Sequence, residues 1–445
     1  MYIHSQKSKT ALGTLFVFVA ALALRLPYVG YPPDVVFDEG VNTSFTSYYF
    51  HQKPFFDYMP PLAPMIFSAA LRGKDVPLVP IRDVAFPHGN FTYLPLRAFI
   101  AIAGSLLAGV IFLIASLIYK NMWFAVLSSS FVVFDNALIA YSRAILPETL
   151  LLLFGFSGIL CWMLSDQAKY KANTVGYKTS LFLAAALLWA LAASLKLTGL
   201  GFLLTASLFL FYRKQYAKLI AACVVFAFVY IAVFFIFFST IKDAAVPYTH
   251  FRNKEIQKID FSTPKTLTNF IPFFIQHHRA TLAAHPEVPT DPAIHPLQWP
   301  LYHRSIGLWG KSNSERINIS GNMVIWISTT LAVLVAILII ALQKTRMINT
   351  NELMLPIVGY LANYVPFLLV PRALYLYHYF AALIFGFLLL PALVQFFAGL
   401  ANDVQQKTFW KFSQNKIMLA LILSAALWYI LLIPRTYGIP FYSMI

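Results

Sequence analysis

Long runs of apolar residues dominate the chain and are separated by shorter polar connections. A helix needs about 17–25 mainly apolar residues to cross the hydrocarbon core of a bilayer. The runs therefore predict eleven membrane-spanning helices. The predicted spans are 11–29, 96–118, 122–140, 147–165, 179–195, 197–212, 217–241, 321–343, 353–371, 375–397 and 417–434.

Two connections, 30–95 and 242–320, are much longer than the others. The first is rich in Pro and aromatic residues, and Asn42 to Phe50 is predicted to form a short helix at the membrane interface. The second has room for a few interfacial helices but is small for an independent domain. No internal repeat is evident. We predict one all-α polytopic membrane domain over 1–445, with two elaborated loops on one face.

The composition excludes a soluble protein. Hydrophobic residues make up 59% of the chain and charged residues only 11%, which is more apolar surface than one soluble core could hide. Cys161 and Cys223 both fall inside predicted spans. They are interpreted as small apolar residues and not as part of a disulfide or metal framework.

The net charge of +16 could suggest a nucleic-acid partner, but its distribution indicates membrane orientation instead. If the N-terminus is cytosolic, the even-numbered connections are short and basic, as the positive-inside rule requires. The sequons that begin at Asn42, Asn90 and Asn318 all fall on the opposite side. No cleavage site precedes Arg25, so no cleavable signal peptide is predicted. The predicted C-terminus is external.

Ionisable residues gather at the outward ends of the predicted spans. A charge at the centre of a membrane helix costs about 2.5–3.5 kcal/mol, so such residues are functional candidates. The acidic pair follows the first span, and a third carboxylate lies further along the same loop. The set is Asp38, Glu39, Asp57, Arg97, Arg143, Glu148, Lys196, Arg372 and His378.

Simpler interpretations exist for each candidate. Asp38 and Glu39 could be a helix N-cap or a solvated pair, and Asp57 could be a turn residue before Pro60-Pro61. Terminal Arg and Lys side chains commonly extend to the interface. The loop histidines lack the paired spacing of a zinc helix and are interpreted as solvated, so no metal site is predicted. They are His277, His278, His285, His295 and His303.

Short motifs recur in a defined order along almost the whole chain. They are Arg25-Leu26-Pro27, Phe37-Asp38-Glu39, Phe55-Phe56-Asp57 before Pro60-Pro61-Leu62, Leu94-Pro95-Leu96-Arg97, Asp135-Asn136, Ser142-Arg143-Ala144-Ile145-Leu146, Ser194-Leu195-Lys196, Gly321-Asn322, Asn363-Tyr364-Val365-Pro366, Arg372 with Leu376-Tyr377-His378-Tyr379, and Tyr437-Gly438. This series resembles the protein O-mannosyltransferases that use dolichyl phosphate mannose. That family also has eleven spans and a cytosolic N-terminus.

The resemblance implies a glycosyltransferase of the GT-C type that transfers mannose to Ser or Thr hydroxyls of proteins, with inversion at the sugar. It makes Asp38 the expected base, with Glu39 orienting it or contacting the acceptor backbone and Asp57 positioning acceptor or sugar. Cationic groups should bind the donor phosphate. The candidates are Arg97, Lys196 and Arg372, with Arg143 weaker and His378 beside Tyr377 completing that wall.

The chain departs from the family pattern at Met59, Pro64 and Met323. The loop 242–320 is too short for the β-trefoil MIR domain that eukaryotic members insert there, so that domain is expected to be absent. The family commonly forms homodimers or heterodimers. An endoplasmic reticulum membrane is favoured over a bacterial plasma membrane.

Three questions stay open at this stage. A carboxylate pair beside a phosphate can bind a divalent cation, so metal dependence is undecided. Another polyprenyl-phosphate sugar transferase of the same architecture is an alternative. A lipid or solute transporter is a further one, although it should show polar residues at mid-span and repeat symmetry.

Overall fold

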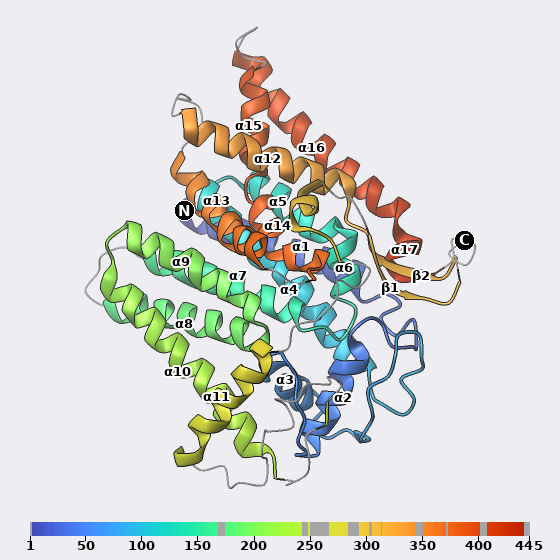
Figure 1. Ribbon diagram of the computed structural model, residues 1–445. Helices are drawn as coiled ribbons and strands as arrows, with labels where there is room; N and C mark the ends of the chain where they lie inside the picture. Colours follow the sequence, from blue (N-terminus) through green and yellow to red (C-terminus); the bar gives the residue numbers. More distant parts are fainter. Residues whose placement is uncertain are drawn as a thin grey trace.

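The structure is a computed structural model. It describes residues 2–167, 174–242, 248–249, 267–283, 293–301, 305–312, 314–342, 350–370, 373–400 and 407–439. Packed helices make up most of the molecule, and a small two-stranded sheet lies beside the last short helix (Figure 1).

Eight helices in the described residues are long and apolar enough to cross a membrane. They are α1 (Tyr2–Arg25), α4 (Leu94–Tyr119), α7 (Glu148–Gln167), α8 (Thr174–Leu195), α10 (Tyr216–Thr240), α12 (Met323–Leu342), α13 (Thr350–Tyr364, extended by a 3-10 turn at Val365–Leu369) and α16 (Lys407–Leu431). The 3-10 turn Leu376–Tyr379 with α14 (Phe380–Phe387) meets α15 (Leu390–Leu400) at a 45° bend, and together they form a ninth crossing if counted as one. The chain is a multi-pass integral membrane protein.

Two of the eleven predicted spans, 122–140 and 197–212, correspond to shorter helices, so the count of eleven is not established. The helices α5 (Met122–Phe134) and α9 (Leu200–Tyr212, after a 3-10 turn at Leu197–Gly199) have 13 residues each, or about 20 Å. A continuous helix over 122–140 was a wrong prediction. Asp135 ends α5 and caps α6 (Asn136–Tyr141) by accepting the N–H of Leu138 at 2.9 Å, and Asp is a preferred N-cap residue.

The connection 30–95 folds back onto the bundle and contributes two helices. The predicted helix near Asn42–Phe50 is confirmed as α2 (Glu39–Phe50), which packs against α3 (Leu62–Ala70). Residues 42–47 are buried, so this helix packs against protein and is not an exposed surface helix. The connection is therefore part of the folded core.

An aromatic cluster joins this connection to α10 and to α11 (Leu267–Ala283). Phe45 of α2 stacks on Phe55 at 4.8 Å, and Phe55 meets Phe237 of α10 at 5.2 Å. Phe56 packs on His277 of α11 at 5.0 Å. Such ring pairs stabilise by about 0.5–1.5 kcal/mol beyond their buried area, so the segment with Phe55 and Phe56 is held from two sides.

A β-hairpin in the second long connection holds the segment before α2. Strands β1 (Ile306–Gly310) and β2 (Arg316–Ile319) pair antiparallel after a 3-10 turn at Pro296–Leu301, and α17 (Ile433–Tyr437) contacts β2. The carbonyl of Leu308 accepts the N–H of Phe37 at 2.9 Å. The indole of Trp309 donates to Asp34 at 3.3 Å. The sequence predicted only helices here.

Candidate active site

Asp38 immediately precedes α2, but its side chain does not cap that helix. Phe37 before it has φ +49°, a left-handed conformation that is uncommon for a bulky residue. No described residue donates a hydrogen bond to the partly exposed Asp38 carboxylate. Burial raises its pKa to about 6, while Lys196 lowers the pKa and Glu148 raises it. A carboxylate with such a pKa can serve as a base near neutral pH.

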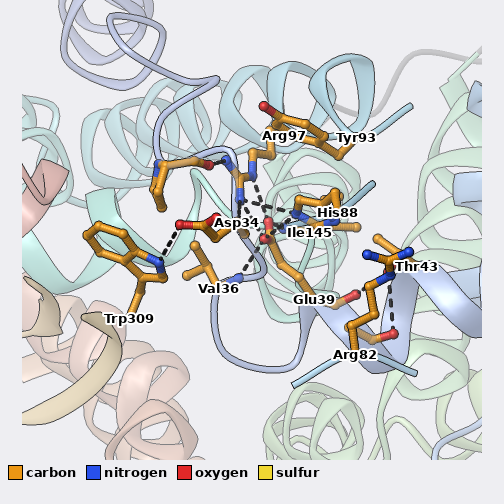
Figure 2. A network of polar contacts seen from close by, with 12 residues as sticks. Asp34, Val36, Glu39, Thr43, Arg82, His88, Tyr93, Arg97, Ile145 and Trp309 are labelled. Carbon is orange, nitrogen blue, oxygen red and sulfur yellow. Dashed lines mark hydrogen bonds and ion pairs between the residues drawn. The ribbon is translucent and has the colours of Figure 1, made fainter. Parts of the chain in front are cut away.

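Glu39 is fully buried at the centre of a polar network (Figure 2). Arg97 donates to both carboxylate oxygens, at 2.8 and 2.6 Å, and His88 lies 3.2 Å from one of them. The N–H groups of Val36 and Ile145 also donate to it, at 2.9 and 2.8 Å. Burial alone would raise the pKa of Glu39, but the charge and hydrogen bonds of Arg97, with those of His88, lower it to about 2.

The position of Glu39 corrects one prediction. A carboxylate that is enclosed on every side cannot contact an acceptor backbone, and its partners are Arg97, His88 and two backbone amides instead of Asp38. Glu39 is therefore an anchor for the start of α2. It acts on Asp38 only by fixing the backbone next to it.

Arg97 belongs to the same network, which contradicts its predicted contact with a donor phosphate. Its other N–H groups donate to the carbonyls of Pro32 at 2.5 Å and Asp34 at 2.8 Å. Its guanidinium lies 4.7 Å from the ring centre of Tyr93 and the residue is 1% exposed. Arg97 instead neutralises Glu39 and ties the segment before α2 to α4.

Asp57 is the second partly exposed carboxylate of the first connection. Its Oδ1 accepts the N–H of Met59 at 3.2 Å, so the turn interpretation of Asp57 is correct. Burial raises its pKa to about 7, the N–H groups of Met59 and Tyr58 lower it, and the charge of Asp38 raises it. Asp38 and Asp57 are thus close enough for the ionisation of one to oppose that of the other.

Lys196 follows α8 and points into the protein instead of extending to the interface. Its Nζ lies 2.6 Å from Oε1 of Glu148 and 4.5 Å from the ring centre of Tyr377, and it is 7% exposed. Lys196, Glu148, Tyr377 and His378 together line one small cavity. The structure therefore brings this predicted cation to the same place as Asp38, whose pKa it influences.

His378 lies in the 3-10 turn Leu376–Tyr379, where its Nδ1 is 3.2 Å from the backbone nitrogen and 2.9 Å from the carbonyl oxygen of Tyr375. Its ring stacks on Tyr377 at 4.5 Å and faces Trp299 at 6.3 Å. These contacts fix the ring at the wall of the cavity that also holds Lys196. Its predicted phosphate contact stays a prediction.

Arg143 is bound to backbone carbonyls, which contradicts its predicted contact with phosphate. It donates to the carbonyls of Arg25 at 2.7 Å, Pro27, and Tyr28 at 2.7 Å. Its guanidinium lies over the ring of Tyr437 at 4.3 Å and it is 6% exposed. Arg143 therefore clamps the end of α1. Arg372 lies outside the described residues, so its predicted role stays a prediction.

Glu148 and Tyr141 are site residues to which the sequence assigned no role. Tyr141 packs between Phe37 at 6.4 Å and Tyr377 at 5.5 Å, beside the Glu148 carboxylate. The only sequence signal for Glu148 was a carboxylate at the outward end of a span. Nothing in the sequence distinguished Tyr141 from other aromatic residues.

The prediction that the loop histidines are solvated was wrong for His277 of α11. His277 is buried, and burial together with His278 lowers its pKa to about 3, although it hydrogen-bonds the backbone of Asp57. His278 lies 3.0 Å from the hydroxyl of Tyr230. His295 is exposed, and His285 and His303 fall outside the described part of the chain.

No three His, Cys, Asp or Glu side chains converge to hold a metal ion within the described ranges. Asp38 influences the pKa of Asp57 and is itself influenced by Glu148, which is already paired with Lys196. Asp38, with a pKa raised to about 6, lies near the cation Lys196, an arrangement that supports proton transfer beside a fixed positive charge.

Comparisons with known proteins identify the family to which the sequence is similar. Residues 15–251 match the profile described as dolichyl-phosphate-mannose-protein mannosyltransferase, and 270–444 match the C-terminal four-transmembrane region of protein-O-mannosyltransferase. Dolichyl-phosphate-mannose–protein mannosyltransferase 4 of Schizosaccharomyces pombe is 33% identical over 159 residues, 35% of this chain and 20% of that one. Protein O-mannosyl-transferase 2 of Danio rerio is 32% identical over 149 residues, 33% and 19% of the two chains. The matched segments thus span about a fifth of these relatives.

The fold is that of GT-C glycosyltransferases. The chain superposes with a TM-score of 0.80 and 16% identity on the Saccharomyces cerevisiae protein O-mannosyltransferase Pmt1-Pmt2 complex bound to the sugar donor, over 97% of this chain and 91% of that one. ArnT from Cupriavidus metallidurans gives a TM-score of 0.57 at 12% identity, over 96% and 77%. At these identities the likeness concerns the fold alone.

Proposed function

Because the chain belongs to the dolichyl-phosphate-mannose-protein mannosyltransferase family, we propose that it transfers mannose from dolichyl phosphate mannose to Ser or Thr hydroxyls of proteins. The observation on which this depends is the Asp38 carboxylate, which is partly exposed, unused by its helix and close to Lys196. Attack by a hydroxyl on a sugar phosphate requires a base and a cation side by side.

In the proposed reaction, the acceptor hydroxyl oxygen bonds to the anomeric carbon of mannose while the bond from that carbon to the phosphate oxygen breaks. The hydroxyl proton passes to Asp38, and dolichyl phosphate leaves with the electron pair of the broken bond. Attack from the face opposite the phosphate inverts the anomeric centre. Proton removal by a placed base contributes roughly 10²–10⁴ in rate. Phosphate is a good leaving group, so this reaction needs no dedicated acid.

Asp57 complements Asp38 in this scheme. Burial raises the pKa of Asp57 and the charge of Asp38 raises it further, so ionisation of Asp38 favours the protonated form of Asp57. A protonated carboxyl group can donate a hydrogen bond, which an ionised one cannot. We assign Asp57 the positioning of an oxygen of the acceptor or sugar, next to the base.

Lys196 is the proposed contact for the donor phosphate, and His378 lines the same cavity. The Nζ of Lys196 forms an ion pair with Oε1 of Glu148 at 2.6 Å. A bound phosphate would therefore share the ammonium group with that carboxylate. Arg372 is proposed as a further phosphate contact on the grounds of the sequence motif. Arg97 and Arg143 are left out because both are buried in contacts with protein.

We further propose that the site faces the lumen of the endoplasmic reticulum and that the N-terminus is cytosolic. The alternating basic connections and the three sequons support this orientation. The Pmt1-Pmt2 complex of Saccharomyces cerevisiae has a similar fold, which supports a dimeric assembly. A divalent cation is not assigned to the step, because Lys196 already supplies positive charge.

Transfer of another polyprenyl-linked sugar is the second candidate, since ArnT shares the fold. Membranes that contain the expressed chain, incubated with labelled dolichyl phosphate mannose and a Ser/Thr peptide, would separate the two. Label should appear on the peptide with the wild type and not with Asp38→Asn. Asp166→Asn is a matched control, because Asp166 is paired with Arg213 and Lys218 at the far end of α7. Label on lipid only, or equal transfer by Asp38→Asn, would contradict the proposal.

A further inference from the structure

Glu148 and Lys196 form an ion pair inside the cavity of the candidate site. Nζ of Lys196 lies 2.6 Å from Oε1 of Glu148, and both residues line the cavity together with Tyr377 and His378. Glu148 is 6% exposed and Lys196 is 7% exposed. Salt screens buried charges much less than exposed ones, so a charged group that enters the cavity interacts with both partners of the pair.

The Glu148 carboxylate is held in this position from a second side. Glu148 is the first residue of α7, where the helix dipole favours an acidic side chain. The hydroxyl of Tyr141 hydrogen-bonds the Glu148 carboxylate, and the ring of Tyr141 is buried against Phe37 and Tyr377. The negative charge therefore stays beside Lys196, and it offsets the positive charge that the ammonium group presents to a ligand.

The proposed reaction changes the charge of the phosphate group. In dolichyl phosphate mannose the phosphate is a diester with one negative charge. The bond to the anomeric carbon breaks with its electron pair left on the phosphate oxygen, and the acceptor hydroxyl proton goes to Asp38. The product is a monoester that carries two negative charges well above about pH 6. The phosphate site therefore holds a monoanion before transfer and a dianion after it.

We infer that Glu148 makes the phosphate site discriminate against the doubly charged product and thereby promotes the release of dolichyl phosphate. This inference rests on the proposed function, because it needs the donor phosphate to bind at Lys196. Attraction to Lys196 and repulsion from Glu148 both grow with the charge of the phosphate. The pair therefore gains little from a second negative charge, whereas Lys196 without Glu148 would bind the dianion more tightly than the monoanion.

Two inhibitors that differ by one charge test this discrimination. Dolichyl phosphate is a dianion at about pH 8, and its methyl ester keeps the lipid and the phosphate but carries one charge. The inhibition constants of both are measured against labelled dolichyl phosphate mannose, with the wild type and with Glu148→Gln. The two constants should agree within about threefold for the wild type. In Glu148→Gln, dolichyl phosphate should become the tighter inhibitor by about tenfold or more, because the opposing charge is gone.

A merely structural Glu148 gives a different pattern. Glu148→Gln would then weaken both inhibitors by the same factor and leave their ratio at the wild-type value, and this outcome would overturn the inference. Glu148→Asp retains the charge and should keep the wild-type ratio, as should Asp166→Asn at the other end of α7.

The wild type decides alone if Glu148→Gln does not fold. A wild-type preference for dolichyl phosphate over its methyl ester beyond about threefold would also overturn the inference. A wild type that transfers no mannose would refute the proposed function itself, whereas normal transfer with an unchanged ratio in Glu148→Gln contradicts only the role of Glu148.

Discussion

Asp38 and Glu39 are adjacent in the chain, yet replacing each by its amide should have different effects: Glu39→Gln should lose stability, and Asp38→Asn should lose activity. Glu39→Gln keeps the shape of the side chain but removes the charge that faces Arg97 and His88. The buried guanidinium is then left without a counter-charge. Asp38→Asn breaks no hydrogen bond that a described residue makes to that side chain.

The loss of stability expected for Glu39→Gln can be estimated from the network in two ways. Removing one partner of a buried ion pair costs about 3–5 kcal/mol. Separately, a pKa that folding lowers from 4.5 to about 2 corresponds to about 3 kcal/mol at neutral pH. Because the folded pKa of Glu39 is the lower one, this stabilisation is complete well above pH 4.5 and is lost as the pH falls toward 2. The two routes agree on a loss of several kcal/mol.

Ionisation of Asp38 affects the free energy of unfolding in the opposite direction to ionisation of Glu39. Folding raises the pKa of Asp38 from 3.8 to about 6, so its charge destabilises the folded protein above that pH. Asp38→Asn should therefore be at least as stable as the wild type while losing activity.

Thermal unfolding of detergent-purified protein and mannosyl transfer to a Ser/Thr peptide measure both effects. Glu39→Gln should melt well below the wild type, and Asp38→Asn should melt at or above it with no transfer. Equal melting temperatures for Glu39→Gln and the wild type would refute the assignment of Glu39 as an anchor. A destabilised Asp38→Asn would refute the assignment of Asp38 as a base free of structural duty.

Three further predictions concern the neighbouring groups. The kcat/KM of transfer should rise as the pH increases through about 6, because the base must be ionised and the pKa of Asp38 lies there; a flat profile would argue against Asp38. Lys196→Met should raise the KM for dolichyl phosphate mannose about tenfold or more in steady-state kinetics, with a smaller effect on the acceptor KM, and Lys196→Arg should recover part of the loss. Arg143→Met should lower the melting temperature, since each hydrogen bond from a charged group contributes about 1.5–3 kcal/mol, and its donor KM should match the wild type; a raised donor KM would restore the phosphate role.

The sequence predicted where the apolar helices lie but not how they are interrupted. Hydrophobic length placed every predicted span on mainly helical residues, although 122–140 and 375–397 are each divided between more than one helix. Asp135 divides one apolar run because its side chain caps the next helix, and a single polar residue in such a run has little weight in a hydropathy pattern. The hairpin of β1 and β2 was also missed, because its strands are short and lie among Pro-rich segments.

The site was predicted unevenly for a physical reason. A charged group can meet a substrate where it lines a cavity, as Lys196 does and Arg97 and Arg143 do not, and a sequence does not show which groups line one. Glu39 and Arg97 are 58 positions apart, and Arg143 is bound by backbone carbonyls that no residue type reveals. Asp38 and Lys196, which the structure brings together, each had both an ordered motif and a position at the outward end of a span; their roles stay predictions.

The hairpin contact with Phe37 also orders events during synthesis. Phe37 and Asp38 are made before Leu308, whose carbonyl accepts the Phe37 N–H, and five membrane-spanning helices lie between the start of α1 and the hairpin. The backbone that presents the base therefore lacks one of its supports until the hairpin has been translated. The nascent protein acquires its complete base-bearing segment only after α1, α4, α7, α8 and α10, which precede the hairpin in the chain, have been made.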